Sequence, residues 1–446
     1  MIQALLPLLR LPALSHQIHT LPVHELDRLH VQVPYSPIRP FANPNGFTKD
    51  PHAPTARPPL SFNLWQLFHA TKKAELLEYR APAAIFLSAL GSLVEHFDLF
   101  AACDELRLQA GKADLYGDFS ATGLAGRLAQ GLAFLFMERR GYPYGERLDS
   151  LLNRMLRARG HRVDWGLRRQ ILNSPLHAQP AQSPDFIFQR NNPAQEVALA
   201  ESKGSFVSPG VQPPIKTVLS EGLDQLNGWN RFLVPVPQKN FVVGSFLREE
   251  GDVYHEPSML AFVDPEGEEQ AGRERSYPDD AIRRANYAAW LRQMSFPQSA
   301  TALAFARPRQ DSGEYLLPTI QLRSGDGTRR FAFRIWAALT DFGPVFPPGA
   351  EVELAKRWEP WVPFPLLGKA AVFLVSAMET TVLNRVSQAV REPSSFALQD
   401  LPSIADVSVP SEGPLTGSAF ADGTFIGAVS AEWLAEQKLE PENFIL

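Results

Sequence analysis

Residues 183–204 read SPDFIFQRNNPAQEVALAESKG, and this stretch decides the fold. Two apolar runs, Asp185 to Phe188 and Glu196 to Lys203, have the length and composition of short β-strands. The polar, proline-containing segment 189–195 between them is typical of a turn. The stretch therefore predicts two antiparallel strands joined by that turn.

This hairpin is expected to gather three functional side chains. With a turn centred near Asn192, Asp185 falls opposite Leu199 and close to Glu201. Glu201 and Lys203 are two residues apart on a strand, so their side chains share one face. Two carboxylates and one ammonium group should therefore meet at one end of the strand pair.

Such a triplet suits metal-assisted hydrolysis of a phosphodiester. Mg²⁺, or Mn²⁺ in its place, binds one or two carboxylates, retained waters and phosphate oxygens. The metal lowers the pKa of a bound water, and a nearby lysine offsets charge in the transition state. The alternative interpretation is that Asp185 caps a turn and that Glu201 and Lys203 form an ordinary ion pair.

The flanking segments alternate between helix and strand patterns. Apolar residues at helical spacing predict helices over Thr122 to Arg140 and over Glu146 to Arg159, each followed by a glycine. After the second predicted strand, which ends at Lys203, Ile215 to Phe232 is helical in pattern and Asn240 to Phe246 is strand-like. The predicted order is therefore helix, helix, strand, strand, helix and strand.

Residues 120–250 resemble the PD-(D/E)XK nuclease superfamily, the restriction-endonuclease-like proteins. Pro184-Asp185 matches the family's first element and Glu201-Ser202-Lys203 its second. The resemblance implies that Asp185 and Glu201 bind the metal together with the backbone carbonyl of Ser202. It also implies that Lys203 is the catalytic lysine of an endonuclease.

The resemblance has one departure and one further similarity. Gln130 stands on the first helix where the family usually has an acidic residue, and Glu138 or Glu146 could replace that acid. Gln225 and Trp229 are similar to the Gln-x-x-x-Tyr element of helicase-associated nucleases. Gln130, Glu138 and Gln225 are therefore candidate accessory residues, and the alternative is that Gln225 faces solvent while Trp229 is a core residue.

An arginine cluster lies within the same region and is a candidate surface for nucleic acid. Residues 127–190 hold eleven arginines against five acidic residues, while the whole chain has a net charge of −5. A phosphate backbone needs such a local cationic surface, and a solvated face with ion pairs is the alternative. The candidate contacts are Arg147, Arg154, Arg157, Arg168 and Arg169.

The fold class expected is α/β, in the sense of a multi-domain α+β chain. Its core is a restriction-endonuclease-like mixed sheet flanked by helices. The 446 residues divide into a proline-rich extended arm over 1–60, a helical region over 61–110, the nuclease-like core over 111–250 and a strand-rich domain over 251–446. In the last of these, Ser324-Gly325-Asp326-Gly327 between two strand-like runs predicts a β-hairpin.

Composition narrows the setting in which the protein would act. The single cysteine excludes an internal disulfide and a cysteine-rich zinc site, which fits a reducing, cytoplasmic location. No apolar run reaches the ~20 residues that span a bilayer, so no membrane is expected. The chain has no phosphate-binding Gly-x-x-x-x-Gly-Lys-Ser/Thr loop, so an ATPase would be a separate subunit.

Three functions remain open from the sequence. The first is a Mg²⁺-dependent endonuclease acting on DNA, in defence against foreign DNA or in repair. The second is a weakened nuclease-fold module that binds nucleic acid without cleaving it. The reason to consider it is that Gln130 stands where the family usually has an acidic residue. The third is a scaffold subunit of a larger complex. The expected partners are accordingly nucleic acid and either a second copy of the chain or another subunit.

Overall fold

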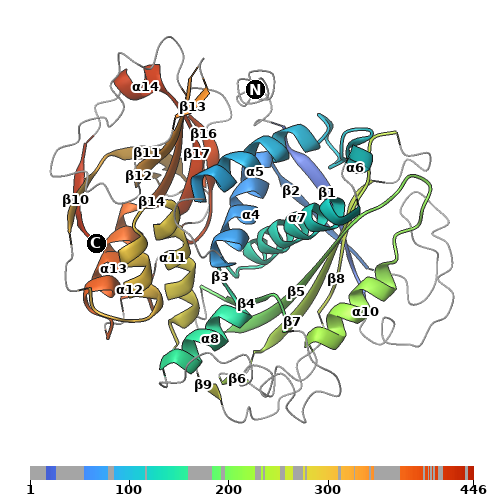
Figure 1. Ribbon diagram of the computed structural model, residues 1–446, viewed down its shortest axis with the longest axis horizontal. Helices are drawn as coiled ribbons and strands as arrows, with labels where there is room; N and C mark the ends of the chain where they lie inside the picture. The colour runs from blue at the N-terminus through green and yellow to red at the C-terminus, as the bar shows by residue number, and fades with distance from the viewer. Residues whose placement is uncertain are drawn as a thin grey trace. The chain divides into compact units, whose positions relative to one another are not determined.

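The computed structural model contains two compact units, each with its own sheet and helices (Figure 1). One unit comprises 17–62 and 98–282, and the other comprises 1–16, 63–97 and 283–446. The residues that the structure describes are 17–26, 55–78, 85–115, 118–158, 183–191, 196–226, 233–234, 237–251, 257–264, 275–276, 279–309, 313–325, 327–340, 343–345, 372–394, 397–399, 401, 404, 407–409, 415–436 and 440–446.

A seven-stranded mixed sheet is the centre of the first unit, with the order β2-β1-β8-β7-β5-β4-β3. Its strands are β1 (His19–Glu25), β2 (Thr55–Phe62), β3 (Tyr144–Arg147), β4 (Phe186–Gln189), β5 (Val197–Phe206), β7 (Lys239–Leu247) and β8 (Met259–Val263). The pairs β5–β7 and β1–β8 are parallel, and the other neighbours are antiparallel. A separate small pair joins β6 (Leu233–Val234) to β9 (Arg275–Ser276).

Helices cover both faces of β5, the strand that carries the predicted Glu-x-Lys triplet. The unit's helices are α6 (Lys112–Leu115), α7 (Asp118–Arg139), α8 (Leu148–Ala158) and α10 (Ile215–Leu226). On one face, a Cβ built on Gly204 would lie 2.2 Å from the carbonyl oxygen of Ala125 in α7. On the other face, Gly222 of α10 packs equally closely on Val242, the strand partner of Glu201. Because alternate residues face opposite sides, Glu201 and Lys203 belong to the α10 side.

The second unit is built on an antiparallel sheet with the strand order β15-β11-β12-β14-β17-β16, and β13 pairs with β12. Its strands are β11 (Thr319–Ser324), β12 (Gly327–Thr340), β13 (Gly343–Val345), β14 (Val372–Glu379), β15 (Val407–Ser408), β16 (Leu415–Ala419) and β17 (Thr424–Ser430). A two-stranded sheet pairs β10 (Glu314–Leu317) with β18 (Glu442–Ile445). The helices are α4 (Leu64–Glu78), α5 (Ile85–Leu99), α11 (Ala281–Gln293), α12 (Pro297–Ala304), α13 (Thr380–Arg391) and α14 (Ala431–Glu436).

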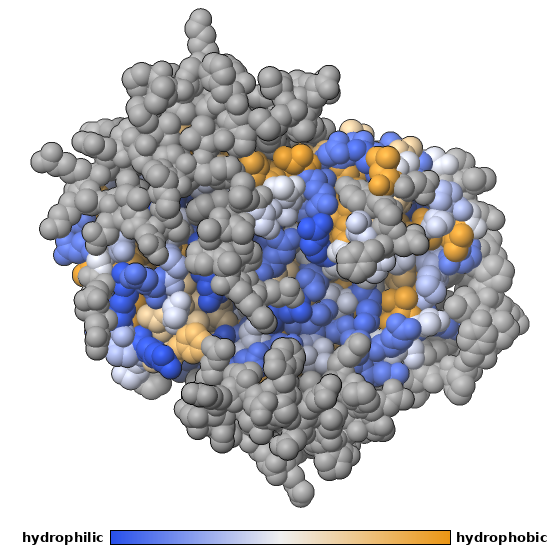
Figure 2. Space-filling view, viewed as in Figure 1, coloured by the Kyte–Doolittle hydropathy of each residue, from blue (hydrophilic) through white to orange (hydrophobic). Residues whose placement is uncertain are grey.

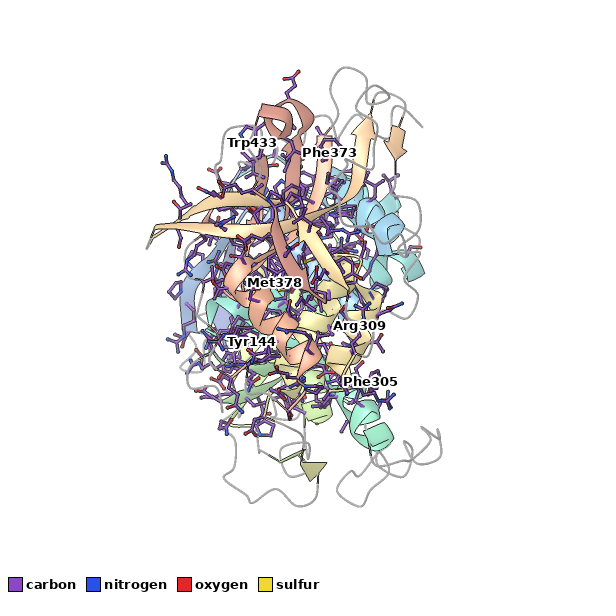
Figure 3. The ribbon with its side chains drawn as sticks, turned by 90° about the vertical axis from the view of Figure 1, so that its left-hand side faces the viewer. Tyr144, Phe305, Arg309, Phe373, Met378 and Trp433 are labelled. Atoms are coloured by element: carbon purple, nitrogen blue, oxygen red, sulfur yellow. The ribbon has the colours of Figure 1, made fainter. Side chains whose placement is uncertain are left out.

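Strand β14 lies in the middle of this sheet and is buried along its length. It is flanked by β12 and β17, and Phe373 and Met378, labelled near its two ends in Figure 3, are buried. Helix α13 follows directly, and the carboxylate of Glu379 caps it by accepting a hydrogen bond from the backbone N–H of Val382 at 2.9 Å. The strand-rich C-terminal region expected from the sequence is therefore present.

The mixed α/β class and the helix-flanked mixed sheet agree with the sequence, but residues 19–25 and 55–60 of the predicted extended arm lie in strands. They belong to β1 (His19–Glu25) and β2 (Thr55–Phe62) of the seven-stranded sheet. Pro58 and Pro59 are compatible with β2 because it is an edge strand, where a missing backbone donor is tolerated. The two compact units also do not follow the predicted boundaries, since 63–97 belongs with the C-terminal region.

Two local predictions also need correction. Residues 144–147 form a strand, so the second helix begins at Leu148 rather than at Glu146. In the β4–β5 pair, Leu199 faces Ile187 rather than Asp185, a register shift of two residues. Because strand faces repeat every two residues, this shift keeps every side chain on its predicted face. The β11–β12 hairpin is confirmed, with Ser324 paired to Gly327.

The described surface is not dominated by one apolar area. On the face drawn in Figure 2, hydrophobic residues occur in separate places among hydrophilic ones. The exposed large apolar side chains of the described residues are Ile18, Leu115 and Val211. Within the described part of the chain, no helix combines the length and the apolar character needed to cross a membrane.

Candidate active site

Asp185 and Glu201 meet where β4 begins beside β5. Phe186 pairs with Ala200, so Asp185 lies next to Glu201 at the end of the registered pair. The backbone N–H of Asp185 donates a hydrogen bond to Oε2 of Glu201 at 3.0 Å. The carbonyl of Asp185 accepts from the backbone N–H of Leu148 at 3.2 Å, which ties the site to the start of α8.

Ser202 orients the carboxylate of Asp185 with two donors. Its backbone N–H lies 3.1 Å from Oδ2 of Asp185, and its hydroxyl donates to the same oxygen at 2.5 Å. Hydrogen bonds to an ionised acceptor are stronger than neutral ones. The two acidic residues are thus held reciprocally, because each accepts from the backbone of the other strand.

Lys203 completes the cluster from the same face of β5. Its ammonium nitrogen lies 2.9 Å from Oε1 of Glu201 and donates to Oε1 of Gln225 at 3.2 Å. Gln225 is on the last turn of α10, the helix that covers this face. Lys203 therefore has two oxygen partners that fix its position beside the carboxylates.

Glu201 carries a perturbed carboxyl group. It is almost fully buried on an apolar strand. Burial, followed by the negative charge of Asp185, raises its pKa to about 7 against the opposing effect of Lys203. Two carboxylates therefore share a poorly hydrated site, an arrangement that strongly favours an additional positive charge.

The oxygen donors of this cluster fit a hard divalent cation. Magnesium sites commonly use one or two carboxylates and keep several waters. Asp185 and Glu201 supply two carboxylates, and no cluster of three or more His, Cys, Asp or Glu side chains that could hold a metal occurs among the described residues. Carboxylate oxygens suit Mg²⁺ or Mn²⁺ better than a metal that prefers thiolate or imidazole ligands.

The candidate accessory residues divide into those near the cluster and those elsewhere. Gln225 contacts Lys203 directly. Gln130 is half-buried on α7, and Glu138 lies at the end of that helix, where its carboxylate is 3.8 Å from Arg139. Glu146 is buried in β3 and forms an ion pair with Arg154. Glu138 and Glu146 each lie beside an arginine, and their role as substitute acids stays a prediction.

Of the five arginines proposed as nucleic-acid contacts, the side chains of Arg147 and Arg154 are among the described residues. The Nη2 atom of Arg147 lies 3.7 Å from Oδ1 of Asp185, and Arg154 pairs with Glu146 and approaches the carbonyl of Ala281 at 3.4 Å. The side chain of Arg157 and the whole of Arg168 and Arg169 lie outside the described residues. A nucleic-acid surface formed by these arginines stays a prediction.

Two residues of the cluster were not assigned their structural roles from the sequence. The hydroxyl of Ser202 acts on Asp185, although only its backbone carbonyl was expected to contribute. Arg147 faces Asp185 because β3 pairs with β4, and that strand was read as the start of a helix. A strand of four residues gives too short a pattern for its pairing to be recognised from sequence.

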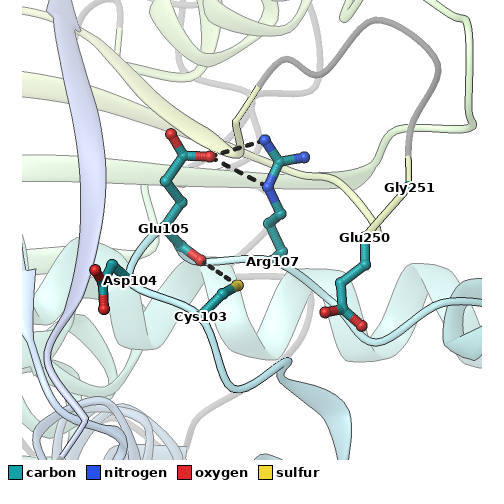
Figure 4. A pocket seen from close by; sticks show the side chains of 6 residues that line it. All are labelled: Cys103, Asp104, Glu105, Arg107, Glu250 and Gly251. Atoms are coloured by element: carbon teal, nitrogen blue, oxygen red, sulfur yellow. Dashed lines mark hydrogen bonds and ion pairs between the residues drawn. The ribbon is translucent and has the colours of Figure 1, made fainter.

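The same unit also has a hollow away from the candidate site residues. It has a volume of about 430 Å³ and is lined by Cys103, Asp104, Glu105, Arg107, Glu250 and Gly251 (Figure 4). Arg107 is paired with Glu105 at 2.8 Å, and the thiol of Cys103 donates to the carbonyl of Glu105. Burial and the charge of Glu250 raise the pKa of the thiol, so the reactive thiolate is disfavoured.

Comparison of the chain with protein-family models, with curated proteins and with solved structures finds no match.

Proposed function

We propose that the protein is a metal-dependent nuclease that hydrolyses phosphodiester bonds, with DNA as its substrate. The observation that carries this proposal is the convergence of Asp185, Glu201 and Lys203 at the β4–β5 edge. A Mg²⁺ or Mn²⁺ ion held there by the two carboxylates would activate water and offset phosphate charge. Defence against foreign DNA or repair is the proposed setting.

The residues of the chain have distinct parts in this proposal. Asp185 and Glu201 would hold the cation, with the carbonyl of Ser202 as a third oxygen. Gln225 and Glu201 position Lys203 beside the carboxylates, where its charge would stabilise the transition state of a bound phosphate. The buried strand that carries Glu201 lowers the local dielectric and strengthens these interactions.

The arrangement of elements supports the same proposal. In chain order, α7, β3, α8, β4, β5, α10, β6 and β7 follow one another, and within the sheet β3, β4 and β5 are antiparallel neighbours while β7 is parallel to β5. This order is similar to the one expected for a restriction-endonuclease-like core. The support concerns the fold alone, because a fold hosts many activities.

A cleavage assay with supercoiled plasmid tests the proposal. We expect nicking with Mg²⁺ or Mn²⁺ and none with EDTA. Lys203→Ala and Glu201→Gln should each reduce the rate on the order of a hundredfold or more. Lys239→Ala is a matched control, since Lys239 lies at the far end of the parallel β5–β7 pair and should leave the rate unchanged. Cleavage that survives both active-site variants would place the activity elsewhere.

A second candidate is a nuclease-fold module that binds nucleic acid without cleaving it. Gln130, half-buried on α7 at the position where the family usually has an acid, favours it. This candidate predicts salt-sensitive binding to duplex DNA with no product at any divalent-ion concentration. Mg²⁺-dependent nicking that is lost in Glu201→Gln would eliminate it.

A further inference from the structure

Arg334 of β12 is a cationic side chain that has no acidic partner among the described residues. The residue is half-buried, so a small ion can reach it from solvent. Burial lowers the pKa of Arg334 to about 10, against an opposing effect of Tyr315. Arg330, four positions earlier on the same face of the strand, is instead paired with Glu442 at 2.7 Å. A guanidinium that is taken out of water without a neutralising charge is costly.

The surroundings of Arg334 are aromatic. Its Cζ atom lies 5.0 Å from the centre of the Phe296 ring. Phe296 and Tyr315 pack edge to face, with their ring centroids 4.9 Å apart. The face of an aromatic ring attracts a cation, but it carries no net negative charge. An anion would therefore be held more strongly here than beside an arginine that already has a carboxylate partner.

Helix α12 begins at the same place. Phe296 precedes its first residue, Pro297, and phenylalanine has no oxygen with which to cap a helix. The first turn reads Pro-Gln-Ser-Ala, so it brings no carboxylate. Arg309, labelled in Figure 3, donates in this turn to Ser299 at 2.6 Å and to Gln298 at 2.9 Å. The positive end of the helix dipole therefore adds to the positive charge around Phe296.

We propose that Arg334 and the start of α12 form a binding site for a phosphoryl group. The planar guanidinium can donate two parallel hydrogen bonds to phosphate oxygens. Backbone N–H groups at a helix N-terminus bind phosphate as well. The site does not depend on the proposed metal centre, because its residues belong to the compact unit that contains 283–446.

The competing explanation is purely structural. A guanidinium that stacks on a phenylalanine ring can cover apolar surface without binding any ligand. The two explanations differ in a measurable way. A phosphoryl site requires that phosphate binds the protein and that loss of the guanidinium weakens this binding, whereas a packing role affects stability alone.

The experiment titrates inorganic phosphate into the full-length protein by isothermal titration calorimetry in a phosphate-free chloride buffer. The wild type should show saturable binding. Arg334→Met should weaken it on the order of tenfold or more, because hydrogen bonds to a charged group are lost. Arg334→Lys keeps the charge but not the pair of parallel donors, so its affinity should lie between the two. The inference is overturned if the wild type does not bind phosphate or if Arg334→Met binds it equally well.

A matched control is available at the other end of the same helix. Arg307 lies beyond the C-terminus of α12, is exposed, and has its Cζ atom 5.5 Å from the centre of the Phe305 ring. Arg307→Met removes the same charge and the same kind of ring contact, and it should leave the phosphate affinity unchanged. If it weakens binding as much as Arg334→Met does, the effect is one of total charge and the inference is wrong.

A second titration, with hexathymidylate that lacks terminal phosphates, distinguishes two sources of the phosphoryl group. If hexathymidylate binding also weakens in Arg334→Met, the site takes the backbone of a nucleic acid. If only inorganic phosphate binding weakens, the ligand is a small phosphorylated molecule. Should Arg334→Met fail to fold, thermal unfolding of the wild type in phosphate and in sodium chloride of equal ionic strength replaces it. Binding to the folded state raises the unfolding temperature in phosphate for the wild type and for Arg307→Met, and the absence of such a rise would overturn the inference.

Discussion

At the residue scale, the site depends on hydrogen bonds that cross from one strand to the next. Asp185 donates its backbone N–H to Glu201, and Ser202 returns two donors to Asp185. Each carboxylate is therefore oriented by the backbone of its neighbour as well as by side chains. Pre-oriented oxygens reduce the cost of ordering the site when a cation binds.

Removing the Ser202 hydroxyl tests this orientation. Ser202→Ala deletes the 2.5 Å hydrogen bond to Asp185 but keeps the backbone donor at 3.1 Å. A hydrogen bond to a charged group contributes ~1.5–3 kcal/mol, so we expect Mg²⁺-dependent cleavage to fall about tenfold. Rates measured at several Mg²⁺ concentrations should show that part of the loss is recovered at high Mg²⁺. An unchanged rate would mean that the hydroxyl does not position Asp185.

His24 gives a prediction for the dependence of stability on pH. It is buried in β1, and burial lowers its pKa to about 4. An unfolded histidine has a pKa of about 6.5, so between these values the unfolded chain binds more protons than the folded chain. The contribution of His24 to stability is thus complete above about pH 6.5 and is lost as the pH falls toward 4.

The comparison of wild type with His24→Gln measures this contribution. Glutamine does not titrate, so the variant should lose less stability between pH 7.5 and pH 4.5 than the wild type loses. Urea unfolding at the two pH values gives the difference directly. Parallel pH profiles for the two proteins would show that His24 does not titrate as its burial suggests.

At the element scale, α7 and β5 are in backbone contact. A Cβ on Gly204 would lie 2.2 Å from the carbonyl oxygen of Ala125 and 2.7 Å from the Cβ of Ala129. Both atoms belong to the rigid part of α7, so neither can move without shifting the helix. Gly204 follows Lys203, and the close approach therefore fixes the strand just beyond the site.

Gly204→Ala should consequently destabilise the protein by ~1–3 kcal/mol or more, the usual cost of overpacking. Gly126→Ala on α7 is the matched control, because no atom lies within 4 Å of its built Cβ. That change should be neutral or stabilise by ~0.5–1 kcal/mol, since alanine favours helix. Chemical unfolding compares the two, and equal stabilities would contradict the packing described here.

Several elements could be predicted from sequence because their patterns were long or carried a specific turn. Helix α7 has a five-residue apolar stripe, and the β11–β12 hairpin has a glycine-rich turn. Strand β3 was missed because four residues show no clear period. Strands β1 and β2 were missed because prolines suggested an arm, and only the tertiary pairing shows that β2 is an edge.

The sequence predicted the three central residues of the candidate site but not the residues that surround them. Alternation along β5 places Glu201 and Lys203 on one face, and the hairpin brings Asp185 to them despite the two-residue register shift. The position of Arg147 could not be predicted, since it depends on the pairing of β3 with β4. The Gln225 contact depends on how α10 packs, which a helical pattern alone does not fix.

At the scale of the whole molecule, the unit that contains 63–97 and 283–446 has a buried ion pair in its core. Lys73 of α4 lies 2.5 Å from Asp422, and both side chains are almost fully buried. Burial alone would raise the pKa of Asp422, but Lys73 and hydrogen bonds from Thr424 and Asn286 lower it below its ordinary value. Tyr287 donates to the carbonyl of Asp422 as well, so the turn before β17 is held by α4 and α11.

Breaking this pair should destabilise the unit strongly. Asp422→Asn leaves the buried ammonium of Lys73 without its carboxylate, which typically costs ~3–5 kcal/mol. The double variant Lys73→Met/Asp422→Asn should lose less, because it leaves no buried charge and keeps an amide oxygen that can accept from Thr424. Glu432→Gln, an exposed change on α14, should have little effect. Scanning calorimetry compares the variants, and a small loss for Asp422→Asn would show that the pair is not needed.

The central claim is that Asp185 and Glu201 hold one divalent cation. Crystals soaked in Mn²⁺ and measured at the manganese absorption edge test it most directly. We expect one anomalous peak about 2.0–2.3 Å from a carboxylate oxygen of each residue, and no such peak in Glu201→Gln. A wild-type crystal with Mn²⁺ bound elsewhere and none between these carboxylates would contradict the claim.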